Sequence, residues 1–169
     1  MSKSGIKRMR GIAMQKKLRS LLWAAFVVYC AVMCYLLFAR PAFNMGKPYL
    51  EELKMNINLI PFRTIREYAF YLINRRNVYL VYDACINLFG NIAAFIPLGF
   101  FLPCFWKKLQ SLKRLLFCSG IVIIMVELIQ LFTLRGCCDI DDLILNLFGA
   151  FLGFLLFKGI SRILLKRRS

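Results

Sequence analysis

Four long apolar segments dominate the pattern of hydrophobic and polar positions along this chain. They cover residues 21–39, 81–106, about 115–134 and 142–165. A helix rises about 1.5 Å per residue, so about 20 apolar residues cross a hydrocarbon core about 30 Å thick. The pattern therefore predicts four transmembrane helices. The first segment follows a basic stretch, as in a signal peptide, but its length and the Arg40-Pro41 pair after it favour an uncleaved helix.

Residues 40–80 are too polar to cross a membrane, but they contain one amphipathic stretch. From residue 62 to residue 76, apolar side chains recur every three or four positions, and Arg63, Arg66 and Glu67 occupy positions between them. Pro61 comes directly before, where a helix readily begins. This periodicity predicts an amphipathic helix in the membrane interface. A helix packed over the transmembrane helices would give the same pattern.

The predicted fold is therefore all-α: a polytopic membrane protein with four transmembrane helices and an interfacial amphipathic helix between the first two. The expected organisation is a basic N-terminal segment (1–20), a four-helix transmembrane domain (21–165) and a basic tail (166–169). Composition agrees, since 60% of the residues are hydrophobic and a soluble domain has about half.

The distribution of charge predicts the orientation of the helices. The net charge is +16, from 24 Lys and Arg and eight Asp and Glu. If both termini are cytoplasmic, the cytoplasmic segments hold sixteen of the basic residues and none of the acids, as the positive-inside rule requires. Attraction to anionic lipids on the cytoplasmic side would add to this orientation. The charge is thus explained by the bilayer, and nucleic-acid binding is not expected.

The chain has no histidine and seven scattered cysteines. The absence of histidine excludes Ser-His and Cys-His hydrolases and His-ligated zinc sites. No cysteine pair has a zinc-binding spacing, so no metal site and no cofactor are expected. Cys137 and Cys138 fall in a predicted loop, where they could be oxidised or paired.

Polar side chains interrupt the last three apolar segments at similar depths. By helix rise, Asn91 lies about 15 Å below the outer end of its segment, Glu127 about 10 Å below, and Asn146 about 6 Å below Asp142. A charge at the centre of a membrane helix costs about 2.5–3.5 kcal/mol on insertion scales, so such residues indicate a site. We predict one pocket near the extracytoplasmic surface, with Arg135 as the counter-ion and the following acidic and amide lining: Asn87, Asn91, Glu127, Gln130, Asp139, Asp142 and Asn146.

Several of these residues also have a purely structural interpretation. Asp139 followed by Asp142 resembles a helix N-cap with an acid in the first turn. The asparagines could simply hydrogen-bond one helix to another, and Gly149 and Gly153 are spaced for close helix packing. Gly90 and Ala94 could serve the same purpose on the second predicted span.

The polar residues belong to three ordered motifs. The first is Asn58-Leu-Ile-Pro-Phe62. The second runs from Asn87 and Gly90-Asn91 to Phe95, Pro97 and Gly99. The third begins with Glu127 and Gln130 and continues through Arg135, Asp139-Ile-Asp-Asp142, Asn146, Gly149 and Gly153.

With these motifs the chain resembles the VanZ-like membrane protein family over residues 56–157. The resemblance implies a bacterial cell-membrane protein and adds Asn58 to the candidate site. The founding member of the family is associated with resistance to the glycopeptide teicoplanin, without a defined catalytic reaction.

Three functions are compatible with this sequence. The first is a non-enzymatic envelope protein whose pocket binds a lipid-linked or headgroup ligand and reduces glycopeptide susceptibility. The second is an intramembrane enzyme acting on such a lipid, with Glu127 as general acid or base and Asp142 or Asp139 orienting substrate or holding Mg²⁺. The third is a small transport or assembly subunit, although no charged path through the inner leaflet is visible.

Overall fold

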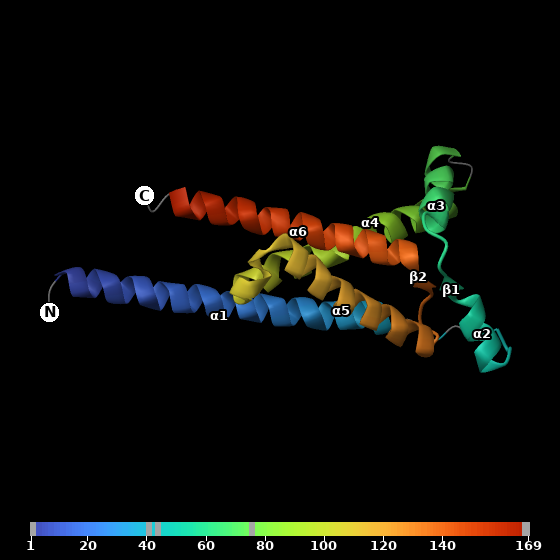
Figure 1. Cartoon of the computed structure of the whole chain (residues 1–169), viewed down its shortest axis with the longest axis horizontal. Helices are drawn as coiled ribbons and strands as arrows, with labels where there is room; N and C mark the ends of the chain where they lie inside the picture. Colours follow the sequence, from blue (N-terminus) through green and yellow to red (C-terminus); the bar gives the residue numbers. More distant parts are fainter. Residues whose placement is uncertain (1–2, 40–41, 43–44, 75–76, 167–169) are drawn as a thin grey trace. The chain divides into compact units, whose positions relative to one another are not determined.

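The computed structural model describes residues 3–39, 42, 45–74 and 77–166. Its elements follow one another along the chain as shown in Figure 1: α1 (Lys3–Phe38), α2 (Tyr49–Met55), β1 (Ile57–Asn58), α3 (Arg63–Asn74), α4 (Val78–Phe105), the short 3-10 helix η1 (Lys107–Gln110), α5 (Leu112–Phe132), β2 (Cys138–Asp139) and α6 (Ile140–Lys166).

Within the described residues, four helices are long and apolar enough to cross a membrane. They comprise residues Lys16–Phe38 of α1, the whole of α4 and α5, and residues Ile140–Ile163 of α6. The all-α polytopic membrane fold is therefore confirmed. The chain divides into two compact units, Met1–Leu36 and Leu37–Ser169, and the candidate site lies entirely in the second.

Glycines set the close packing of α4 against α6 in the second unit. A methyl group on Gly149 would lie 3.0 Å from the carbonyl carbon of Ile92, and one on Gly153 would lie 2.9 Å from the backbone N of Phe100. Real side chains do not tolerate such approaches to backbone, so these positions need glycine. The predicted packing role of Gly149 and Gly153 is confirmed.

The corresponding prediction for Gly90 is wrong. The only heavy atom within 4 Å of a methyl group placed there is Ile86 Cγ2, on the same helix, at 3.9 Å. On α4 the glycine in close contact is Gly99, since a methyl group there would lie 2.8 Å from Ala150 Cα. The interface with α6 therefore extends further along α4 than expected.

Two very short strands connect the chain between α2 and α3 with the residues directly before α6. β1 and β2 pair in parallel, with Ile57 opposite Cys138 and Asn58 opposite Asp139. This pairing holds the chain before α3 against the turn between α5 and α6, so that α3 begins beside the first turn of α6. The predicted amphipathic helix is present as α3, and none of its residues is buried.

Candidate functional site

Asp139 joins three segments at the start of α6. Its Oδ1 accepts a hydrogen bond from the backbone N–H of Asp141 at 2.8 Å, which is the geometry of a helix N-cap. Its Oδ2 accepts from Thr64 Oγ1 at 2.6 Å and from Asn58 Nδ2 at 3.1 Å. The cap predicted from the sequence is present, and the same carboxylate also fastens β1 and α3 to α6.

Asp141, which the sequence analysis left out of the site, makes the second fastening. Its side chain is fully buried and accepts the backbone N–H groups of Phe62 at 2.6 Å and Ile65 at 3.1 Å. Because these donors are at the start of α3, the carboxylate supplies the acceptor that the first turn of a helix lacks. We call Asn58, Thr64, Asp139 and Asp141 the carboxylate clamp.

Below the clamp, polar side chains of α4, α5 and α6 meet. Asn91 Nδ2 of α4 donates to Asp142 Oδ1 of α6 at 2.5 Å. Glu127 of α5 accepts a hydrogen bond from the backbone N–H of Asp139, and Asp142 is close enough to act on it electrostatically. Asn146 follows Asp142 by one helical turn and is 3% exposed. These four residues, Asn91, Glu127, Asp142 and Asn146, form what we call the acid–amide cluster.

Two buried acceptors in this cluster have no hydrogen-bond partner. They are Glu127 Oε2 and Asn146 Oδ1, on side chains that are 6% and 3% exposed. A buried polar atom left without a partner costs about 1–3 kcal/mol, and most such atoms in proteins have one. These two atoms are therefore the polar atoms of the cluster that a further hydrogen-bond donor could satisfy.

The other predicted pocket residues have partners elsewhere. Asn87 Nδ2 donates to the Asp83 carbonyl O of its own helix at 2.8 Å. Gln130 Nε2 donates to the Leu37 carbonyl O at 3.0 Å, and Arg135 donates to the Phe38 carbonyl O. Asn58 belongs to the clamp. The structure thus brings together Asn91, Glu127, Asp142 and Asn146, with Asp139 at their edge.

The part of the chain that the structure describes contains no group of three His, Cys, Asp or Glu residues placed to hold a metal ion. The seven cysteines are free thiols, so Cys137 and Cys138 are not paired with each other. Burial is the main cause that raises the pKa of both thiols above the ordinary value, and nearby acidic groups raise it further.

Comparison with protein families assigns the chain. The family model described as VanZ/LLP1 matches residues 26–165, which is most of the sequence. The chain belongs to the VanZ/LLP1 family. No curated protein and no solved structure matches it.

The three motifs that carry the VanZ/LLP1 resemblance meet in the structure, although they are far apart in the sequence. Asn58 of the first motif bonds to Asp139 of the third. Asn91 of the second bonds to Asp142, and Glu127 receives the Asp139 N–H. The carboxylate clamp and the acid–amide cluster therefore bring residues of all three VanZ/LLP1 motifs together.

Proposed function

We propose that this VanZ/LLP1 protein binds a cell-envelope ligand, such as a lipid-linked cell-wall intermediate, in its acid–amide cluster. The observation that supports this most directly is the pair of open acceptors, Glu127 Oε2 and Asn146 Oδ1, on nearly buried side chains. A cluster that served only to join helices would satisfy these atoms with donors from the neighbouring helix. Among the described residues, Asn91 donates to Asp142 and the Asp139 N–H donates to Glu127, and the two open atoms remain without a donor.

The chemistry of the open atoms limits the ligand. Asn146 Oδ1 is an acceptor, and Glu127 Oε2 is one when its carboxyl group is ionised, so the group that satisfies both donates hydrogen bonds or carries positive charge. Hydroxyl groups of a sugar and a primary ammonium group both meet this requirement. An anionic group does not, because Asp142 already acts electrostatically on Glu127 as a second acidic group.

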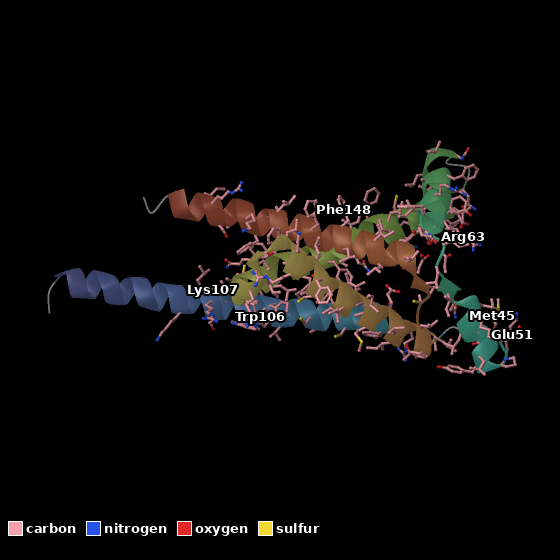
Figure 2. All side chains as sticks on the ribbon, in the orientation of Figure 1. Met45, Glu51, Arg63, Trp106, Lys107 and Phe148 are labelled. Atoms are coloured by element: carbon pink, nitrogen blue, oxygen red, sulfur yellow. The ribbon has the colours of Figure 1, made fainter. Side chains whose placement is uncertain are left out.

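The proposed location is the bacterial plasma membrane, with both termini in the cytoplasm and the cluster near the outer surface. Arg63 and Glu51 lie at one end of α5, and Trp106 and Lys107 lie at the other (Figure 2). The basic turn that contains Lys107 would then face the cytoplasm, as the positive-inside rule requires. Anionic lipids of that leaflet are the expected partners of the basic turn and the basic tail.

Resistance to glycopeptides is the phenotype that the family resemblance suggests. A protein that holds a lipid-linked precursor, or that alters its presentation at the outer surface, would reduce the amount of target available to teicoplanin. The proposal requires no catalysis, only occupancy of the cluster.

The experiment compares teicoplanin susceptibility in cells that express the native protein, Glu127→Gln, Asn146→Ala or Asn87→Ala at equal levels. We expect the first two substitutions to remove any protection, because each changes an open acceptor. Asn87→Ala is the matched control, since Asn87 bonds only within its own helix. If Glu127→Gln and Asn146→Ala both keep full protection, the acid–amide cluster is not the binding site.

An intramembrane enzyme is the second candidate, favoured by one observation. The buried Glu127 carboxyl group has an open oxygen and lies near Asp142, so it could give or take a proton on a bound lipid. Mass spectrometry of envelope lipids separates the candidates. A lipid species that appears or disappears with the native protein but not with Glu127→Gln favours catalysis, and an unchanged lipid profile favours binding.

A further inference from the structure

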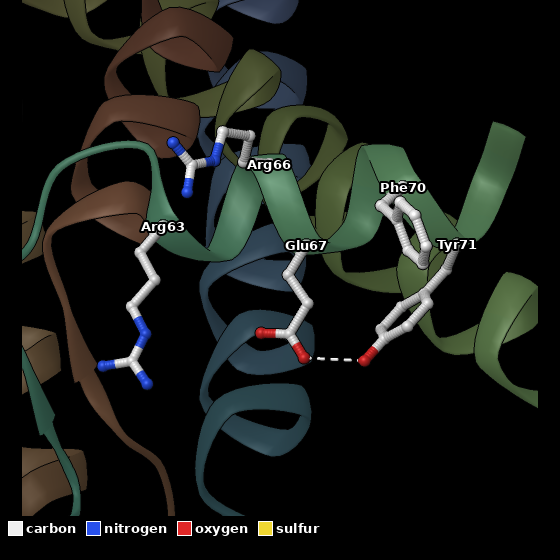
Figure 3. A pocket seen from close by; sticks show the side chains of 5 residues that line it. All are labelled: Arg63, Arg66, Glu67, Phe70 and Tyr71. Carbon is white, nitrogen blue, oxygen red and sulfur yellow. Dashed lines mark hydrogen bonds between the residues drawn. The ribbon is translucent and has the colours of Figure 1, made fainter.

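The surface of α3 carries two arginines that form no ion pair with the described residues. Arg63, Arg66, Glu67, Phe70 and Tyr71 line a shallow depression of about 510 Å³ on this helix (Figure 3). Both arginines are exposed, and neither makes an ion pair with any residue that the structure describes. The two arginines are three residues apart on α3, and Figure 3 shows their guanidinium groups extending in different directions from the helix.

The acid nearest in sequence is held away from these arginines. Glu67 is four residues after Arg63, a spacing at which the two commonly form an ion pair. Instead, Glu67 Oε1 accepts a hydrogen bond from Tyr71 Oη at 2.7 Å, and Figure 3 shows the carboxylate turned toward that ring. Tyr71 thus competes with Arg63 for Glu67 and leaves the guanidinium group available to another anion.

Exposed apolar side chains lie on both sides of the two arginines along the chain. Before them, Leu59 and Ile60 are 64% and 58% exposed, and after them Phe70 and Ile73 are 61% and 80% exposed. The carboxylate clamp holds the backbone of the 59–62 turn in place, so the exposure of this turn is built into the fold. Apolar side chains beside cationic groups are typical of a surface that lies in the headgroup region of a bilayer.

We propose that Arg63 and Arg66 each bind the phosphate of an anionic phospholipid headgroup, while the neighbouring apolar side chains enter the acyl region. The guanidinium group matches phosphate in geometry as well as charge. In the topology predicted from charge, this surface lies in the outer leaflet, opposite the basic turn and tail. The site is independent of the acid–amide cluster, because none of its residues belongs to that cluster.

The test measures binding of fluorescent phosphatidylglycerol to the full-length protein in a neutral detergent. Each arginine near an anionic membrane surface contributes to the free energy of binding, so that removing two arginines weakens binding by about 10- to 30-fold. We expect this loss in R63Q/R66Q. The control K47Q/K54Q removes the same charge from two exposed residues at and just before α2 and should retain affinity within about threefold of native, since an exposed charge outside the site contributes little.

A second variant keeps both arginines. Tyr71→Phe releases Glu67 to pair with Arg63 and should weaken phosphatidylglycerol binding by about threefold, the effect of a helix-surface ion pair. Adding Glu67→Gln to Tyr71→Phe removes the competing acid and should restore binding. This pair of variants keeps the proposal testable even if R63Q/R66Q does not fold.

Three results would overturn the proposal. The first is native affinity in a folded R63Q/R66Q protein. The second is an equal loss in K47Q/K54Q, which would mean that only net charge matters. The third is full competition by inorganic phosphate at the concentration of the lipid, which would identify a site for free anions. Glu127→Gln should leave this binding unchanged, so failure here is distinct from failure of the proposed cluster ligand.

Discussion

Replacing Gly149 with alanine tests whether close packing of α4 and α6 holds the cluster together. The added methyl group would lie 3.0 Å from the Ile92 carbonyl C and 3.2 Å from Ile92 Cα. These are backbone atoms of a helix, so α4 must move as a unit to accept the methyl group. Overpacking of this kind costs about 1–3 kcal/mol, and rigid backbone neighbours favour the upper end. Alanine offsets about 1 kcal/mol of this cost through its helix propensity, which leaves a net loss of about 2 kcal/mol.

Thermal unfolding of the purified protein in detergent measures this loss. For a chain of this size, about 2 kcal/mol lowers the Tm by roughly 4–8 °C. Gly159→Ala is the control on the same helix, because a methyl group there meets no atom within 4 Å. Its Tm should be unchanged or slightly higher. If Gly149→Ala and Gly159→Ala have the same Tm, the two helices are not in the contact described, and the basis for placing Asn91 beside Asp142 fails.

Three further predictions concern single side chains. Asp141→Ala should cost about 2–4 kcal/mol, since it leaves two backbone donors of α3 without an acceptor, and limited proteolysis should then cut within residues 59–62. Asn91→Ala should lose about 1 kcal/mol in detergent unfolding while Asn87→Ala loses less than about 0.5 kcal/mol, and equal losses would contradict the cross-helix bond to Asp142. Burial, then Asp142, raises the pKa of Cys137, so its reaction with a membrane-impermeant maleimide should be slow at pH 7 and accelerate as the pH rises and thiolate forms. Asp142→Asn removes a negative charge and lowers that pKa, so labelling at pH 7 should become faster.

The transmembrane helices could be predicted because the hydropathy signal is long and local. The second predicted span, 81–106, is α4 (Val78–Phe105), and the third, about 115–134, is α5 (Leu112–Phe132). The start of α5 precedes the predicted span because a helix continues into charged sequence where it leaves the bilayer. Lys113 and Arg114 thus form part of the first turn of α5, although their charges lower the local hydropathy.

The short elements and the clamp could not be predicted because they depend on contacts between distant segments. β1 and β2 contain two residues each and pair across about eighty positions, which leaves no periodic pattern. α2 has seven residues and is stabilised by Glu52, whose Oε1 accepts the Met45 N–H at 2.8 Å. Asp141 was missed for the same reason. Its donors are backbone groups of Phe62 and Ile65, and no side-chain pattern reveals them.

The candidate site was predicted in part. Helix rise alone placed Asn91, Glu127 and Asn146 at similar depths. The structure brings Asn91 of α4 to Asp142 of α6 because Gly99, Gly149 and Gly153 allow the two helices to approach. The same reasoning grouped Asn87 and Gln130 with them. Depth does not determine the direction of a side chain around its helix, and these two bond elsewhere.

Availability of carboxylate oxygens distinguishes the three acids first considered as catalytic. The Asp139 carboxylate already accepts three hydrogen bonds from the protein, and Asp142 Oδ1 accepts one from Asn91. Glu127 retains an open oxygen, and the bond to its carboxyl group comes from the backbone of Asp139. We therefore infer that Asp139 is a positioning residue: its side chain fastens β1 and α3, and its N–H orients Glu127. A loss of function in Asp139→Asn would then be accompanied by weaker attachment of α3, whereas Glu127→Gln would abolish ligand contact in an otherwise native fold.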